Sequence, residues 1–167
     1  MPEKDQLFSS NVKYGGVFDF KDFYKFAYEW LTEEFNLLVT EEKYEEKIKG
    51  SEKELKIEWV GVRKVTDYFK YEVKVKYEIK ALKDVQIEKD GKRIKTNDGS
   101  VKTTIKGTLI RDYEGKFETS GFQKFLRSIY EKWVIPSRIE EYEEKLILKC
   151  DEFLQQIKAW LSLEGKR

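Results

Sequence analysis

An unbroken alternation of apolar and charged side chains over residues 69–81 constrains this chain more than any other feature. The apolar positions are Phe69, Tyr71, Val73, Val75, Tyr77, Ile79 and Ala81, and lysines and glutamates fill the positions between them. Successive side chains of a strand point to opposite faces, so this pattern predicts a strand with one buried face and one solvated face. Sheets with one solvated face are typically antiparallel. The segment therefore predicts an antiparallel sheet with a single apolar face.

Weaker alternation on either side of this segment predicts the rest of the sheet. Residues 6–14, 38–49, 55–62 and 101–113 each have strand character, and Val60-Gly61-Val62 breaks the phase in the manner of a bulge. Gly50-Ser51, Asp90-Gly91 and Asn97-Asp98-Gly99 have the composition of turns. We expect five to seven antiparallel strands.

Helical periodicity replaces the alternation towards both ends of the chain. After Asp19, a plausible N-cap, one helical face carries Phe20, Phe23, Ala27, Trp30 and Leu31. The period returns over residues 122–134 and, beyond Pro136, along a helix of roughly 40 Å at about 1.5 Å per residue. The apolar stripe of that last helix contains Ile139, Tyr142, Leu146, Cys150, Phe153, Ile157 and Trp160.

This order of elements predicts a two-layer α+β fold, in which the apolar sheet face packs on an N-terminal helix and a long C-terminal helix. No repeat or linker is visible, so we expect one domain over residues 1–167. The order resembles the helix-grip architecture of START-like ligand-binding proteins, whose curved antiparallel sheet wraps a long C-terminal helix. The resemblance implies a gap between sheet and helix that often holds an apolar ligand. It rests on element order, the helix over 122–134 departs from it, and no residue roles are carried over.

The composition removes several kinds of chemistry. The chain has no histidine, one cysteine and one methionine, and it has neither a dinucleotide-binding fingerprint nor a Walker-type loop. Cys150 lies on the apolar stripe of the last helix, where a buried side chain is a better interpretation than a nucleophile. We expect no cofactor, no metal site and no catalytic residues. An enzyme working through Glu, Lys or Tyr is the least favoured of three hypotheses.

The same composition bears on location. A lone cysteine cannot form an internal disulfide, no apolar run is long enough to span a membrane, and the charged N-terminus is unlike a signal peptide. We therefore expect a cytoplasmic protein without a membrane span. The 33 basic and 32 acidic residues are mainly Lys and Glu, a bias that resembles proteins from hot environments.

One charged surface is predicted by the alternation itself. The solvated phase of residues 69–81 contains four lysines, and the strand after Val101 adds two more; they are Lys70, Lys74, Lys76, Lys80, Lys102 and Lys106. If these strands are neighbours, the exposed sheet face is locally basic. Glu72 and Glu78 interrupt it, and the aromatic side chains point the other way. We therefore expect a solvated face rather than a nucleic-acid partner.

The inward phase suggests the first functional hypothesis. Four polar residues share it with apolar side chains: Tyr71, Tyr77, Tyr113 and Arg111. Buried polar groups need hydrogen-bond partners. Those partners are either water or a ligand in a cavity, or they are reached when the hydroxyls extend to the sheet rim and Arg111 extends past the strand end. The hypothesis is a non-enzymatic module that binds an apolar or amphipathic small molecule between the sheet and the C-terminal helix. The predicted lining residues are Tyr71, Val75, Tyr77, Leu109, Arg111, Leu146 and Phe153.

The alternative hypothesis is a protein-interaction or assembly module. The apolar residues of the last helix, from Leu146 to Trp160, lie near heptad spacing, which is typical of helices that pack on another subunit. The partner would be another protein or a second copy in a homodimer.

Overall fold

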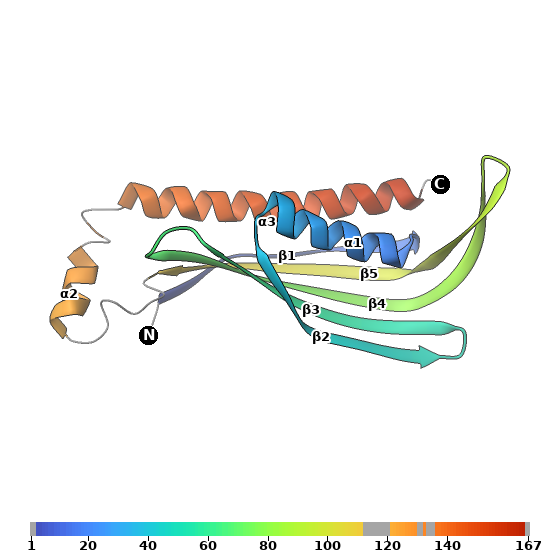
Figure 1. Cartoon of the computed structure of the whole chain (residues 1–167), viewed down its shortest axis with the longest axis horizontal. Coiled ribbons are helices and arrows are strands. Elements are labelled where there is room, and N and C mark those ends of the chain that lie inside the picture. The colour runs from blue at the N-terminus through green and yellow to red at the C-terminus, as the bar shows by residue number, and fades with distance from the viewer. Residues whose placement is uncertain (1–2, 112–120, 130–131, 133–135, 166–167) are drawn as a thin grey trace.

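The computed structural model describes residues 3–111, 121–129, 132 and 136–165. Its elements, in chain order, are β1 (Glu3–Val17), α1 (Phe20–Glu29), a π-helical turn η1 (Trp30–Glu34), β2 (Leu38–Lys49), β3 (Glu52–Lys64), β4 (Phe69–Lys89), β5 (Lys92–Arg111), α2 (Gly121–Ile129) and α3 (Pro136–Gly165). The sheet forms one layer, and α1 and α3 lie on one side of it (Figure 1). The predicted two-layer α+β fold with a long C-terminal helix is confirmed.

The strands form one five-stranded sheet in the order β1-β5-β4-β3-β2, and every neighbouring pair is antiparallel. Consecutive hairpins connect β2, β3, β4 and β5. β1 pairs with the free edge of β5, so the first and the last strand along the chain are neighbours in the sheet. The alternating segment lies in β4, near the centre of the sheet. Its apolar positions up to Ile79 are buried, as predicted.

Two local predictions are wrong. Asn97-Asp98-Gly99 forms no turn, because β5 continues through it from Lys92 to Arg111. Val60-Gly61-Val62 forms no bulge either, because Gly61 keeps the inward phase of β3. A Cβ added at Gly61 would lie 2.8 Å from Cδ1 of Leu37. The side chain of Leu37 therefore fills the place that Gly61 leaves empty, which a reading of β3 alone does not reveal.

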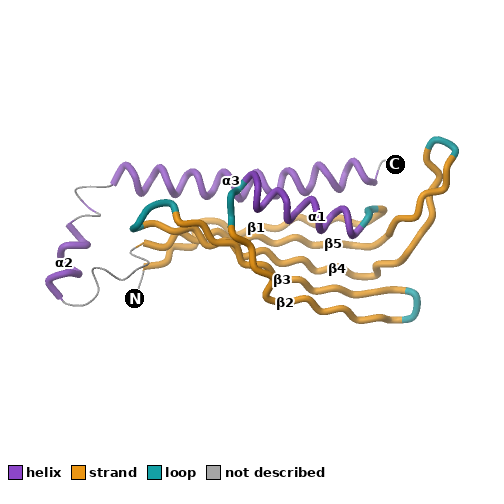
Figure 2. Tube along the Cα trace, in the orientation of Figure 1, coloured by secondary structure: helices purple, strands orange, loops and turns teal. Residues whose placement is uncertain are grey.

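The register of the sheet shifts elsewhere, between Gln6 and Phe8 in β1, between Glu41 and Lys43 in β2, and in β4. The shift in β4 matters most for the shape of the sheet. The register of β4 with β5 shifts between Lys80 and Lys83, and Ala81 has a positive φ of 53°. Gly99 lies opposite, where an added Cβ would come within 3.0 Å of the Cα of Leu82. A bulge bends its strand and increases the local twist. Beyond this point the β4–β5 hairpin curls toward the helix layer (Figures 1 and 2).

The helices differ in how much they bury. Asp19 caps α1 as predicted, since its carboxylate accepts a hydrogen bond of 3.0 Å from the amide of Asp22. α3 runs lengthwise over the sheet and buries Leu146, Cys150, Phe153, Leu154, Ile157 and Leu161 (Figure 1). α2 lies apart from this core (Figure 2), and none of its residues is buried. The predicted continuation of α2 to residue 134 lies mostly outside the described residues.

Candidate functional site

Six of the seven predicted lining residues lie together in the hydrophobic core. They come from β4, β5 and α3, and at most 3% of their surface is exposed; they are Tyr71, Val75, Tyr77, Leu109, Leu146 and Phe153. Arg111 is partly exposed at the end of β5. The structure thus places the seven as the sequence predicts with respect to sheet face and helix stripe.

Two polar groups of this set are hydrogen-bonded within the protein. The Tyr71 hydroxyl donates to the carbonyl oxygen of Tyr142 in α3 at 2.8 Å. Nη2 of Arg111 donates to Oδ2 of Asp5 in β1 at 2.8 Å. This contact joins β1 and β5, which are the first and last strands along the chain. These contacts are protein partners of the kind expected at a sheet rim and a strand end.

Tyr77 differs from Tyr71 because its hydroxyl is fully buried without a hydrogen-bond partner in the described part of the chain. Thr103 lies directly opposite in β5, and its Oγ1 is likewise buried without a hydrogen-bond partner among the described residues. Burial raises the pKa of Tyr77 well above its ordinary value. Its ring packs edge-on against Phe23 at 5.5 Å and Trp59 at 4.8 Å between centroids. The ring therefore contributes packing, whereas the hydroxyl is buried at a cost.

Tyr77→Phe is expected to raise the free energy of unfolding by about 1 kcal/mol, because it removes an unpartnered hydroxyl and keeps the ring contacts. Urea unfolding followed by circular dichroism measures this. Tyr71→Phe is the matched control, since it removes a hydroxyl that donates at 2.8 Å and is expected to cost about 1 kcal/mol. If Tyr77→Phe costs as much as Tyr71→Phe, the Tyr77 hydroxyl is satisfied in solution and this interpretation is wrong.

β5 and α3 are in direct contact at Gly107. Gly107 of β5 faces α3, and a Cβ added there would lie 2.7 Å from Sγ of Cys150 and 3.4 Å from Cδ1 of Leu146. Both of those side chains are fully buried. The close approach of strand and helix leaves no room beside Gly107 for even a methyl group.

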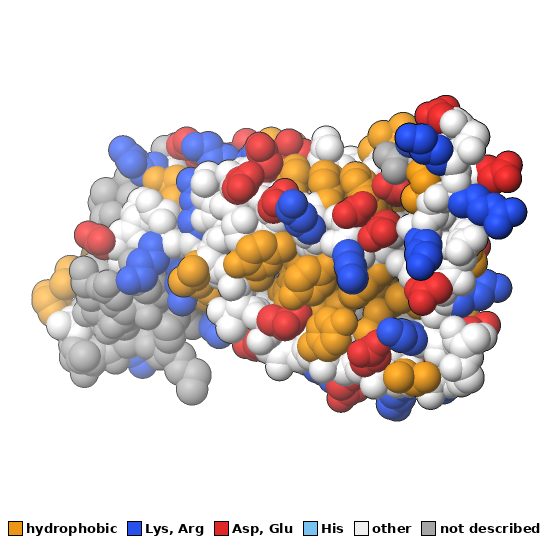
Figure 3. Space-filling model, turned by 45° about the vertical axis from the view of Figure 1, so that its right-hand side comes forward, with side chains coloured by type: hydrophobic (Ala, Val, Ile, Leu, Met, Phe, Trp, Pro, Cys, Tyr) orange, Lys and Arg blue, Asp and Glu red, His pale blue; other side chains and the backbone are white. Residues whose placement is uncertain are grey.

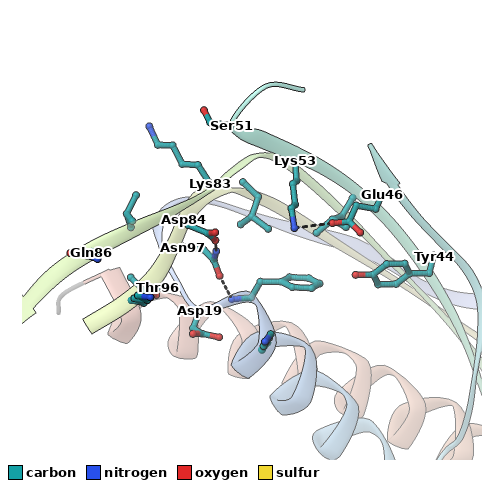
Figure 4. A pocket seen from close by; sticks show the side chains of 16 residues that line it. Asp19, Tyr44, Glu46, Ser51, Lys53, Lys83, Asp84, Gln86, Thr96 and Asn97 are labelled. Atoms are coloured by element: carbon teal, nitrogen blue, oxygen red, sulfur yellow. Dashed lines mark hydrogen bonds and ion pairs between the residues drawn. The ribbon is translucent and has the colours of Figure 1, made fainter. Parts of the chain in front are cut away.

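A pocket of about 790 Å³ opens elsewhere, where the bent ends of β2, β3, β4 and β5 face the start of α1 (Figure 4). Phe20, Leu55, Leu82 and Val85 supply its apolar walls, and none of the seven predicted residues lines it. Tyr44 directs its ring into this space from β2 (Figure 4). Loss of hydration at Tyr44 raises the pKa of its hydroxyl.

Asn97 forms hydrogen bonds to two neighbouring elements on one side of the pocket. Its Oδ1 accepts from the amide of Phe20 at 3.0 Å, and its Nδ2 donates to Oδ1 of Asp84 at 2.8 Å. Its backbone carbonyl also accepts from the amide of Phe18 at 3.0 Å. One side chain therefore links β5, the first turn of α1 and β4. The start of α1 is held against the bent hairpin, and this contact fixes the shape of the pocket.

An ion pair lies on the opposite side of the pocket. Nζ of Lys53 in β3 is 3.1 Å from Oε1 of Glu46 in β2 (Figure 4). Hydrogen bonding to Glu46 and its negative charge raise the pKa of the Lys53 ammonium. On the surface of this half of the molecule, hydrophobic side chains form a patch among charges of both signs (Figure 3). The pocket therefore combines apolar walls with fixed polar groups.

Sequence reasoning missed this pocket because it depends on the bend in β4. The available signal was the spacing of buried residues: Ile79 is followed by Leu82, three positions later, instead of by Ala81. A step of three in a two-residue period indicates a bulge. The polar residues Asn97 and Asp84 gave no such signal, since their meeting requires both the register and the bend.

The described residues offer little for redox or metal chemistry. They contain no group of three or more His, Cys, Asp or Glu side chains that could hold a metal ion. Cys150 is buried, as predicted, and burial raises the pKa of its thiol to about 12, so a thiolate nucleophile is disfavoured.

Comparison with known protein families, with curated proteins and with solved structures finds no match to this chain. None of the helices that the structure describes is both long enough and apolar enough to cross a membrane.

Proposed function

We propose that the protein is a non-enzymatic module that binds a small amphipathic molecule in the pocket between the start of α1 and the bent ends of β2–β5. The observation that carries this proposal is the pocket of about 790 Å³, in which a minority of apolar side chains is combined with polar and charged ones. Sites for small molecules are typically concave spaces of about 300–1,000 Å³ that are mostly apolar. This pocket has such a volume and a more polar lining, which favours an amphipathic ligand over a purely apolar one. The sequence-based hypothesis placed the ligand beneath α3. The present proposal places it on the same sheet face, at the start of α1.

The lining indicates the chemistry of the ligand. Leu55 and Leu82 are almost fully buried and offer a fixed apolar surface. The Lys53–Glu46 ion pair and the Asn97–Asp84 hydrogen bond offer polar groups that are already held in place. A ligand with an apolar body and a polar end satisfies both. The resemblance of the element order to helix-grip ligand-binding proteins supports the same class of function.

The alternative, assembly through the long C-terminal helix, has less support. Leu146, Cys150, Phe153 and Ile157, which suggested a heptad face, are fully buried against the sheet within the chain. These side chains are therefore not available for contact with a second subunit.

A cytoplasmic location stays a prediction from the sequence.

The test uses 1-anilinonaphthalene-8-sulfonate, an amphipathic dye whose fluorescence rises in apolar surroundings, with the purified full chain. Tyr44→Asp places a carboxylate in the pocket at a side chain that is 47% exposed, so the fold should tolerate it. Ile48→Asp is the matched control, because Ile48 is also an exposed apolar residue of β2 but does not line the pocket.

We expect saturable binding near one dye per chain, weakened about tenfold by Tyr44→Asp and less than about twofold by Ile48→Asp. A tenfold change corresponds to about 1.4 kcal/mol, a reasonable cost for a charge introduced beside an apolar ligand. Absence of saturable binding to the wild type, or equal weakening in both variants, would contradict the proposal. Circular dichroism confirms that both variants are folded.

A further inference from the structure

The strand register brings lysines from four adjacent strands onto the outer face of the sheet, away from α1 and α3. We call the lysine face the set Lys13 of β1, Lys64 of β3, Lys70 and Lys74 of β4, and Lys102 and Lys106 of β5. These residues alternate with the buried positions of the same strands, which places them on the solvated side. The predicted basic surface required β4 and β5 to be adjacent strands, and they are adjacent.

The lysine face contains three cross-strand pairs of like charge. Lys13 lies opposite Lys102, Lys74 opposite Lys106, and Lys64 opposite Lys70. Like charges directly opposite each other destabilise a sheet. Closer to the β2 edge of the same face the pairs have opposite charge, as in Glu58 opposite Lys76 and Lys56 opposite Glu78. Stability alone explains the second arrangement but not the first.

Two acidic residues of β4, Glu72 and Glu78, interrupt the lysines of this face, and Glu78 is already paired. Glu78 is engaged by Lys76 at 3.1 Å, and Lys76, Lys102 and Lys80 together lower the pKa of its carboxyl, which reports a positive field on this face. Lys74 and Lys106 take part in no ion pair with the described residues. The proposal below therefore departs from the expectation of a merely solvated face, which stays the alternative that the experiment tests.

We propose that the lysine face binds the phosphate backbone of a nucleic-acid duplex without sequence preference. From Lys70 to Glu78 the face runs roughly 27 Å at about 3.4 Å per residue. A duplex carries one negative charge per about 1.7 Å, so many phosphates lie within that length. Between the lysines stand small polar side chains, Ser9, Asn11, Thr104 and Thr108, of the types that commonly contact phosphates.

The remaining side chains of the face favour a duplex over other polyanions. Its alternating positions on β1, β5, β4 and β3 carry no aromatic residue; the aromatic side chains of β4 are buried on the other side. Single-stranded nucleic acid is usually held by stacking on aromatic rings, and membrane surfaces by aromatic and apolar anchors. The face also carries Glu72, Glu78 and the apolar residues Val60, Val62 and Ile110. Lysine, hydroxyl and amide groups nevertheless make up most of β1 and β5 on this side, and such groups fit the outer surface of a duplex.

The test measures fluorescence anisotropy of a labelled DNA duplex of about 20 base pairs at low and at physiological ionic strength. The test variant is Lys13→Glu with Lys74→Glu, which turns two like-charged pairs into opposite-charged ones and should therefore fold at least as well as the wild type. The matched control, Lys25→Glu with Lys158→Glu, makes the same change in net charge on α1 and α3.

We expect micromolar binding at low salt that weakens steeply as salt is added. The test variant should bind about tenfold more weakly, with a salt slope smaller by about two, and the control should bind within about twofold of the wild type. The proposal is overturned by absence of binding at low salt, by equal losses in both variants, or by tighter binding to vesicles of anionic phospholipid than to the duplex. Because the dye site lies on the other face of the sheet, these results are independent of the pocket.

Discussion

Gly107→Val is expected to lower the free energy of unfolding by about 3 kcal/mol. A Cβ at this position would lie 2.7 Å from Sγ of Cys150, and the surrounding side chains are fully buried. The strand and α3 would have to separate, which would disturb contacts along the length of the helix. Urea unfolding followed by circular dichroism measures the loss. Gly15→Val in β1 is the control, since nothing lies within 4 Å of its added Cβ.

A double-mutant cycle assigns the loss to one contact. Gly107→Ala should cost less when Cys150→Ala is already present, because the alanine lacks the sulfur that the new methyl group would meet. If the two changes are additive, the sulfur is not the obstacle, and β5 and α3 are further apart than the structure shows. Near additivity would therefore restore space for a ligand beneath α3.

The second large effect is a loss of stability in alkaline solution. Burial raises the pKa of Cys150 from 9.0 to about 12 and the pKa of Tyr71 from 10.0 to about 12. Both groups therefore release their protons more readily in the unfolded chain than in the folded one. The folded state keeps its full stability below about pH 9 and loses it as the pH rises toward about 12. Three pKa units at Cys150 correspond to about 4 kcal/mol.

Urea unfolding at several values between about pH 8 and about pH 11 measures this slope. Cys150→Ala should be less stable than the wild type at neutral pH, because it loses buried packing, but its stability should fall less steeply with pH. The slope is thus the informative quantity. A wild-type slope equal to that of Cys150→Ala over this range would mean that the thiol titrates normally, which contradicts its burial.

The sequence predicted the layers of the fold well because each of them has a strong local period. The alternation in residues 69–81 identified the buried face of β4, and Asp19 with the apolar residues after it identified the start of α1. The structure adds what local periods do not contain. The pairing of β1 with β5 joins residues about a hundred positions apart, such as Asp5 and Leu109. Gly61 looks like a break until Leu37 is seen to fill its place.

The functional surfaces were harder to predict for a related reason. A pocket is the space that remains after all side chains have packed, so inward-facing residues such as Val75 and Phe153 do not show whether a gap lies beside them. The pocket instead follows from the bulge at Ala81 and from Asn97, which holds α1 against the bent hairpin. The lysine face needed the register, because Lys74 and Lys106 are opposite each other only in the folded sheet.

The location of the bound ligand is the central claim, and amide chemical-shift mapping during a titration with 1-anilinonaphthalene-8-sulfonate tests it most directly. The account predicts that the largest shifts fall on Tyr44, Leu82 and Asn97, which line the pocket, while Leu146 and Phe153 in the core beneath α3 change little. Largest shifts at Leu146 and Phe153, or no localised shifts at saturating dye, would contradict it.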